Sequence, residues 1–161
     1  MMPLAALLLL QPSPLPGAVE IRPGIFIVKG VPGPETFAAL KAAGITHVLS
    51  LRNPSEGDFT KDAAATKAAG ADYGACPLDR EPTDAALDAF RARLKALPKG
   101  ARLLVHCASG NRVAGALFTH WVLDEGMDDA KALDLAHQAG LHNPVTEAAA
   151  KAYVAKARPR P

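Results

Sequence analysis

The chain has few aromatic residues, two cysteines and no large excess of either charge. Aromatic residues make up 5% of the 161 positions, so a core must be built mainly from alanine, leucine and valine. Cys76 and Cys107 alone cannot provide the disulfide framework of a small secreted domain. The net charge is +2 and no basic stripe with interleaved aromatic residues occurs, which argues against nucleic acid as a partner. His120, His137 and His142 have no metal-ligand spacing with either cysteine, so we predict no metal and no other cofactor.

The chain also lacks an apolar run long enough to span a membrane. The run from Leu4 to Leu10 is too short to cross a bilayer, and the proline-rich segment after it ends in Gly17 and Ala18. This order resembles the hydrophobic region and cleavage zone of a secretory signal, although no lysine or arginine precedes the run. We therefore predict a leader over residues 1–18 and a domain over residues 19–158. Export to the periplasm and a cytoplasmic location both stay open.

From residue 19 onward, strand patterns alternate with helix patterns. Strands are predicted at 19–22, 25–29, 47–52, 71–78 and 102–106, and helices at 34–43, 59–69, 84–97, 113–123, 127–139 and 144–155. With 161 residues, 49% of them hydrophobic, the chain can bury one core but not two large ones. Because strands joined through helices pair in parallel, we predict a single α/β domain with a mostly parallel central sheet flanked by helices.

The strand predicted at 102–106 leads into the most informative residues of the chain. Its apolar run is followed by His106 and Cys107, a short loop and Arg112. Ligands of parallel sheets bind beyond the carboxyl ends of the strands, which is where Cys107 falls. A cysteine at the mouth of an anion-binding loop is stabilised as a thiolate, whereas at an ordinary strand end it is a small buried apolar residue.

The loop itself has the composition of an anion-binding turn. A glycine-containing turn between a strand and a helix points successive backbone N–H groups inward, and the start of the helix adds positive partial charge. Arg112 adds a planar, permanently charged guanidinium, which suits a tetrahedral oxyanion such as phosphate better than a lysine would. Cys107 is therefore the predicted nucleophile. The predicted substrate-binding residues are Ala108, Ser109, Gly110, Asn111 and Arg112.

These residues resemble the signature of the cysteine-dependent protein tyrosine and dual-specificity phosphatases, in which His-Cys is followed by five residues, Arg, and Ser or Thr. The chain matches at His106, Cys107, Gly110 and an arginine, but its loop is one residue shorter and Val113 stands where the signature arginine would fall. The short loop is similar to that of small bacterial phosphatase-like proteins related to the amino-terminal domain of beta-lactamase-hydrolase-like proteins. The similarity to their pattern extends over about residues 22–123.

The resemblance implies a tyrosine-phosphatase-like fold and a phosphomonoester hydrolase that acts through a phosphocysteine intermediate on a phosphorylated protein or small molecule. Two alternatives stay open. The short loop also occurs in rhodanese-like sulfurtransferases, in which Cys107 would carry a persulfide. The absence of a hydroxyl residue after Arg112 is instead compatible with a phosphate-binding module of weak catalysis. The sequence indicates neither the substrate nor the oligomeric state.

The resemblance also implies a general-acid aspartate in the loop upstream of the cysteine strand. Asp79 follows the strand predicted at 71–78 and is the first choice, because an acid must reach the leaving-group oxygen from a mobile loop. Asp84 is the second choice. Beside Thr83, however, Asp84 also fits a stabilising carboxylate in the first turn of a helix.

Three further residues near the cysteine have predicted structural roles. We expect His106 to hydrogen-bond the backbone beside the thiol without acting as a base. Arg52, at the end of its strand, is expected to form a salt bridge with Glu56 rather than to bind a substrate anion. Cys76 is expected to be a small core residue, with a reversible disulfide to an oxidised Cys107 as the alternative.

Overall fold

The computed structural model describes residues 13–159. Most of the predicted leader, residues 1–12, lies outside the described residues. Within its remainder, Leu15 is fully buried against the core and Ala18 is the first residue of strand β1. A leader boundary after Ala18 stays a prediction.

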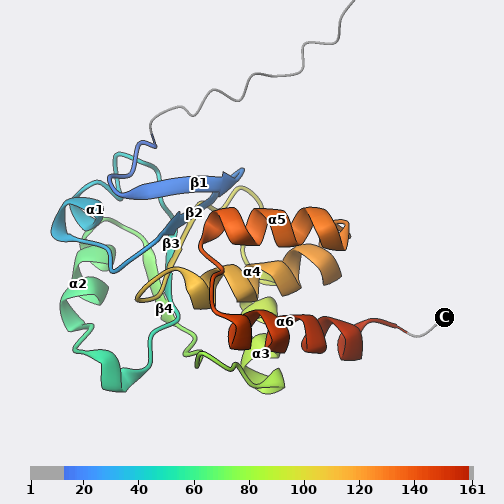
Figure 1. The fold of residues 1–161 in the computed structure, drawn as a ribbon. Coiled ribbons are helices and arrows are strands. Elements are labelled where there is room, and N and C mark those ends of the chain that lie inside the picture. The colour runs from blue at the N-terminus through green and yellow to red at the C-terminus, as the bar shows by residue number, and fades with distance from the viewer. Residues whose placement is uncertain (1–12, 160–161) are drawn as a thin grey trace, which may run out of the picture.

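A five-stranded sheet forms the centre of the domain (Figure 1). The strands are β1 (Ala18–Arg22), β2 (Ile25–Val28), β3 (His47–Ser50), β4 (Asp72–Ala75) and β5 (Leu103–His106). Their spatial order is β1-β2-β5-β3-β4, in which only the β1–β2 pair is antiparallel. The predicted mostly parallel sheet is thus confirmed, with β5 at its centre.

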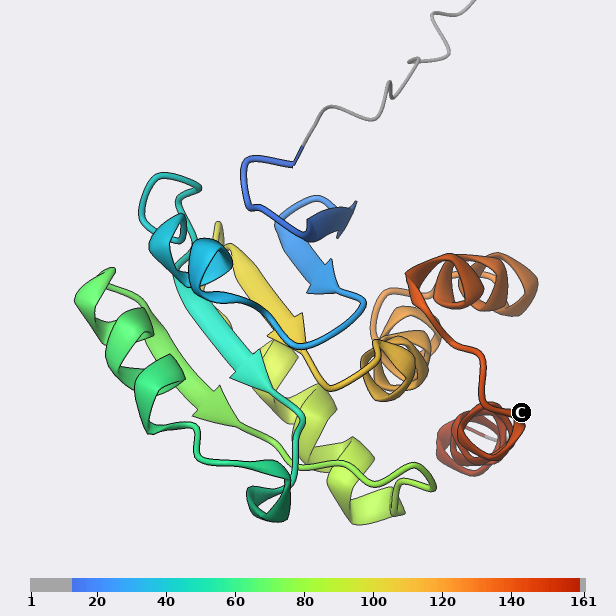
Figure 2. The same ribbon diagram turned by 60° about the vertical axis from the view of Figure 1, so that its left-hand side comes forward.

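Helices cover both faces of this sheet (Figure 2). The short helices α1 (Pro34–Ala38) and α2 (Thr60–Ala68) lie on one face. The other face carries α3 (Asp84–Lys95) and α4 (Asn111–Leu123), and α5 (Asp129–Ala139) and α6 (Pro144–Ala157) pack against α4. No helix within residues 13–159 is both long enough and apolar enough to cross a membrane.

The central strand β5 contributes to the core on both faces of the sheet. Leu103 and Val105 pack in the cluster beneath α3 and α4, and Leu104 packs in the cluster beneath α1. A strand buried on both sides has a continuous apolar run instead of an alternating one, which explains the pattern that precedes the cysteine. The predicted alternation of strands and helices and the strand predicted at 102–106 therefore hold.

Most elements are shorter than the sequence predicts, and the differences at β3, β4 and α1 change the loops around the sheet. β3 ends at Ser50 and β4 at Ala75, because the chain leaves the sheet there to form two loops beyond its carboxyl edge. The first of these loops contains a short 3-10 helix, Pro54–Glu56, that the sequence analysis did not identify. α1 ends at Ala38, five residues before the predicted end at residue 43, and turns follow it.

Candidate active site

Cys107 lies directly after β5, beneath the loop that joins this strand to α4. The Cys107 side chain is fully buried, and the backbone N–H of Gly110 donates to its Sγ at 3.1 Å. Gly110 has a left-handed backbone, with φ at 85°. A Cβ at this position would lie 3.3 Å from Cα of Lys29, so both the turn and the close contact favour glycine. The backbone N–H of Gly110, the glycine of the predicted anion-binding turn, thus donates to Sγ of Cys107.

Arg112 is held at this loop by a carboxylate from another part of the chain. Its Nη1 and Nη2 donate to Oε2 and Oε1 of Glu56, each at 2.7 Å, and Nη1 also donates to the carbonyl of Leu78 at 3.1 Å. The Arg112 and Glu56 side chains are 13% and 28% exposed, which makes this a partly buried, two-pronged pair. The plane of the guanidinium is therefore fixed before any substrate binds.

Glu56 is itself fixed by the short helix that ends in it. Its Oε2 accepts the backbone N–H of Asn53 at 2.6 Å, and the Asn53 side chain completes a capping box. The hydrogen bonds from Arg112 are the largest cause that lowers the pKa of Glu56 to about 2. Glu56 is thus a carboxylate at any ordinary pH.

Replacing Glu56 by glutamine should lower the free energy of unfolding at pH 7 by about 1 kcal/mol, a value reduced from the full pKa shift because solvent screens the pair. The folded-state pKa of Glu56 lies below its ordinary value of 4.5, so the pair stabilises the protein above pH 4.5 and loses its effect as the pH falls toward 2. Urea unfolding of both proteins between pH 7 and pH 2.5 measures this. The difference in the free energy of unfolding between Glu56→Gln and the unaltered protein should become smaller as the pH falls. A difference that does not change with pH would contradict the stabilising role of the ion pair between Glu56 and Arg112. Glu81→Gln, an exposed carboxylate, is the control.

A cavity of about 370 Å³ lies over the cysteine loop. Four of the five predicted substrate-binding residues line it, namely Ala108, Ser109, Asn111 and Arg112; Gly110 instead contributes its N–H to the sulfur below. Asp79 lines the same cavity. The other lining residues are Asn53, Glu56, Arg80, His142 and Asn143. The lining is almost entirely polar and comes from the loops after β3, β4 and β5 and from the loop between α5 and α6.

The structure separates the two aspartates that the sequence offered as acids. Asp79 is exposed at the cavity, and its Oδ1 accepts the side-chain N–H of Asn53 at 3.0 Å. Asp84 does not line this cavity. Asp84 is the first residue of α3 and accepts from Nζ of Lys156 at 2.6 Å. Of the two aspartates, only Asp79 lines the cavity over the cysteine loop.

The expected salt bridge between Arg52 and the Glu56 carboxylate is wrong. Nη2 of Arg52 donates to the backbone carbonyl of Glu56 at 2.9 Å, and its guanidinium lies over the Phe59 ring, 4.4 Å from the centroid. The Glu56 carboxylate accepts instead from Arg112 and from the backbone N–H of Asn53.

His106 is a fully buried residue beside the thiol, and neither ring nitrogen has a hydrogen bond of good geometry within residues 13–159. Burial lowers the pKa of His106 to about 4, and the contact of its ring with the backbone of Cys107 opposes this shift in part. The ring is therefore neutral at pH 7 and places no positive charge beside the thiol.

Cys76 is a buried residue of the same apolar cluster that contains Cys107. Both thiols are free in the described part of the chain, and burial raises the pKa of the Cys76 thiol. A thiol of this kind is unreactive, which favours the expected packing role. A redox link between the two cysteines stays a prediction.

Five polar residues of the cavity had no predicted role in the site, namely Asn53, Glu56, Arg80, His142 and Asn143. Asn53 and Glu56 could have been recognised from Asn-Pro-Ser-Glu, because Asn followed three residues later by Glu is a helix-capping pattern. That pattern identifies the short helix but not its contact with Arg112. His142 offered no signal at all, because only the packing of α5 and α6 against α4 brings it to the cysteine loop.

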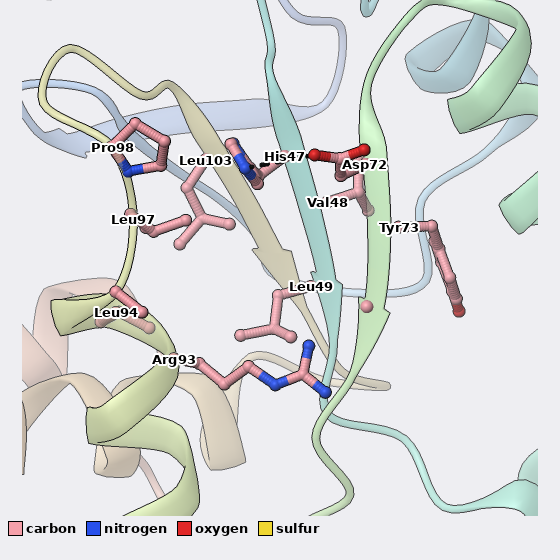
Figure 3. A pocket seen from close by; sticks show the side chains of 12 residues that line it. His47, Val48, Leu49, Asp72, Tyr73, Arg93, Leu94, Leu97, Pro98 and Leu103 are labelled. Carbon is pink, nitrogen blue, oxygen red and sulfur yellow. Dashed lines mark ion pairs between the residues drawn. The ribbon is translucent and has the colours of Figure 1, made fainter.

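A second cavity, of about 220 Å³, lies between α3 and the sheet near β4 (Figure 3). Leu49, Leu94, Leu97 and Leu103 make much of its lining, the Arg93 guanidinium lies beside Leu49, and His47 pairs with Asp72 at 3.6 Å. This cavity reaches the amino-terminal ends of the strands and has no nucleophile in its lining. The cavity over the cysteine loop, in contrast, is lined by Asp79 and Arg112.

Comparisons with known proteins agree with this fold. No family model and no curated protein matches the chain. Among solved structures, a DUF442 protein of Shewanella putrefaciens CN-32 is similar at 23% identity and a TM-score of 0.69, over 87% of this chain and 92% of that protein. P. aeruginosa TpbA, solved in complex with pTyr, is similar at 20% identity and a TM-score of 0.67, over 86% and 82% of the two chains. The core catalytic domain of the S. cerevisiae PP-IP phosphatase Siw14 is similar at 15% identity and a TM-score of 0.70, over 87% of each chain.

At these identities the similarity shows the fold. The predicted tyrosine-phosphatase-like α/β fold is confirmed, and the similarity extends over most of the chain.

Proposed function

We propose that this protein is a phosphomonoester hydrolase that works through a phosphocysteine intermediate on Cys107. The observation that carries the proposal is the pairing of a buried cysteine, which accepts a loop N–H, with an arginine whose guanidinium is fixed at the same loop by Glu56. These groups provide a nucleophile and an oxyanion site at the carboxyl end of the central strand. The phosphatase fold of the chain supports the same reading.

In the first step, the Cys107 thiolate attacks the phosphorus of the ester and the bond from phosphorus to the ester oxygen breaks. The electron pair of that bond goes to the departing oxygen, which takes a proton from Asp79 and leaves as an alcohol. Because Oδ1 of Asp79 accepts from Asn53, Oδ2 is the oxygen that would carry this proton. The loop amides and Arg112 stabilise the charge on the equatorial oxygens.

In the second step, water attacks the phosphocysteine and the sulfur leaves as a thiolate. A hydroxyl after the arginine would assist this departure in the related phosphatases, but Val113 is apolar and fully buried. The Gly110 N–H, at 3.1 Å from Sγ, stabilises the departing thiolate instead. The substrate would be a phosphorylated protein or small molecule. Among the similar structures, TpbA was solved with pTyr and Siw14 is a PP-IP phosphatase.

Replacing Asp79 by asparagine should slow the turnover of an alkyl phosphate by roughly 10²-fold or more and that of p-nitrophenyl phosphate much less. An alkoxide needs a proton to leave, whereas p-nitrophenolate leaves readily without one. Steady-state kinetics on both substrates measure this difference. Asp84→Asn is the control, because Asp84 pairs with Lys156 away from the cavity. Equal, small losses on both substrates would remove Asp79 from the mechanism.

One observation favours a second function, a sulfurtransferase in which Cys107 carries a persulfide. Only four residues separate Cys107 from Arg112, which is the loop length of rhodanese-like proteins. A shorter loop makes a narrower ring of amides and favours a compact group. The phosphatase remains our proposal because the arginine and the aspartate line the same cavity.

A paired assay tests the two functions. Purified protein is given p-nitrophenyl phosphate in one reaction, and thiosulfate with cyanide in the other, each repeated with Cys107→Ser. Phosphate release that depends on Cys107 would support the proposal. Thiocyanate release without phosphate release would overturn it in favour of the sulfurtransferase. Activity on neither substrate, with phosphate still protecting Cys107 from alkylation, would indicate a phosphate-binding module.

A further inference from the structure

The loop between α5 and α6 lies directly on the cysteine loop. A Cβ at Gly140 would be 3.5 Å from the carbonyl carbon and oxygen of Gly110, so the two backbones are in close contact. Oδ1 of Asn111 accepts the backbone N–H groups of His142 and Asn143, at 3.1 Å and 3.0 Å. The first residue of α4 thereby fixes the backbone of the loop at His142, a residue that lines the cavity over the cysteine loop.

The hydrogen bond of the His142 ring determines which of its two nitrogen atoms can accept a proton. Nδ1 lies 2.7 Å from the carbonyl oxygen of Gly140. A carbonyl oxygen only accepts, so Nδ1 carries the hydrogen and the neutral ring keeps a lone pair on Nε2. His142 is exposed, and Nε2 makes no hydrogen bond or ion pair within residues 13–159. A histidine in this form can take a proton from water.

Other polar groups of the cavity are less free to act as a base. The Glu56 carboxylate is bound by Arg112 and by the backbone of Asn53. Asp79 remains, but one of its oxygens already accepts from Asn53. Among the described residues that line the cavity, Nε2 of His142 and Oδ2 of Asp79 are thus two proton-accepting atoms without a hydrogen-bond partner, and Asp79 is already the proposed acid of the first step.

We propose that His142 is the base that activates water for hydrolysis of the phosphocysteine, an inference that rests on the phosphatase function proposed above. The water oxygen bonds to phosphorus while the bond from phosphorus to Sγ breaks, and Cys107 leaves with the electron pair as a thiolate. Nε2 of His142 takes a proton from the attacking water, and the resulting imidazolium returns that proton to solvent. Asp79 then serves as the acid of the first step, and the two half-reactions use different residues.

His142→Asn is the variant best suited to test this role. The asparagine amide can donate to the Gly140 carbonyl in place of Nδ1 and so preserve the loop, but it has no atom that replaces Nε2 as a base. In stopped-flow reactions with p-nitrophenyl phosphate, the burst of p-nitrophenol reports formation of the phosphocysteine, and the later linear rate reports its hydrolysis. We expect the ratio of burst rate to linear rate to rise by roughly 10²-fold, with the burst itself retained.

The matched control is His137→Asn. His137 lies at the end of α5 and pairs with Glu147 without lining the cavity over Cys107, so its ratio should equal that of the unaltered protein. Added imidazole should restore part of the linear rate of His142→Ala, which a purely structural role would not predict. Asp79→Asn should slow the formation of the phosphocysteine from alkyl phosphates, and the phosphocysteine should not accumulate in this variant.

The outcomes separate this inference from the function on which it rests. The role of His142 would be contradicted if His142→Asn had the same ratio of burst rate to linear rate as the unaltered protein, or if the burst and linear rates fell by the same factor. Neither result would contradict the proposed phosphatase function. A phosphocysteine that accumulates in Asp79→Asn instead of His142→Asn would also overturn it and give both steps to Asp79. If the unaltered protein releases no p-nitrophenol in a Cys107-dependent way, the proposed function falls and the inference falls with it.

Discussion

Cys107→Ser is expected to reduce the turnover of p-nitrophenyl phosphate by roughly 10⁴-fold or more, to the level of the uncatalysed background. The reaction needs a thiolate, and the hydroxyl of serine does not ionise near neutral pH. The Ser109 hydroxyl is exposed on the same loop, but as a neutral hydroxyl it is a much weaker nucleophile than a thiolate. Steady-state release of p-nitrophenol with active-site-titrated protein measures the loss.

Two controls make this result specific to the nucleophile. Cys76→Ser removes the other thiol, which packs in the core, and should lower stability more than turnover. Cys107→Ser should still be stabilised against thermal unfolding by phosphate or vanadate, since the loop amides and Arg112 remain. Substantial turnover by Cys107→Ser would contradict the phosphocysteine mechanism, whatever substrate is used.

Arg112→Lys is expected to lower kcat/KM for phosphate esters by about 10²- to 10³-fold although the charge is kept. The guanidinium makes two bonds of 2.7 Å to Glu56 and a third to the Leu78 carbonyl. A lysine ammonium cannot reproduce this planar arrangement, so Glu56 would lose its two-pronged partner and the oxyanion its fixed donor. Steady-state kinetics on p-nitrophenyl phosphate, with circular dichroism to check folding, measure the effect.

Arg80→Lys is the matched control for this variant. Arg80 lines the same cavity but is exposed, so its replacement should change kcat/KM by only a few-fold. Similar losses in the two variants would mean that the cavity needs positive charge without needing the geometry of Arg112. That result would contradict the role given to the Glu56 pair.

The sequence by itself determined the class of the fold and the position of Cys107, the proposed nucleophile. The alternation of strand and helix patterns predicted a mostly parallel sheet, and the apolar run before His106 predicted the strand that leads to Cys107. These signals are local, because hydrophobic periodicity depends only on which face of a short segment is buried. The end of a parallel strand then fixed where Cys107 had to lie.

Only the tertiary structure decided which residues surround that cysteine. Glu56 pairs with a residue 56 positions away, and His142 reaches the cavity through a contact with Asn111 that spans 31 positions. The capping pattern of Asn53 to Glu56 predicts a turn of helix, but not the arginine to which its carboxylate binds. The sequence analysis expected Arg52 to pair with the Glu56 carboxylate, whereas in the folded chain that carboxylate binds Arg112. Contacts between loops depend on how whole layers pack, and no periodicity within one segment encodes them.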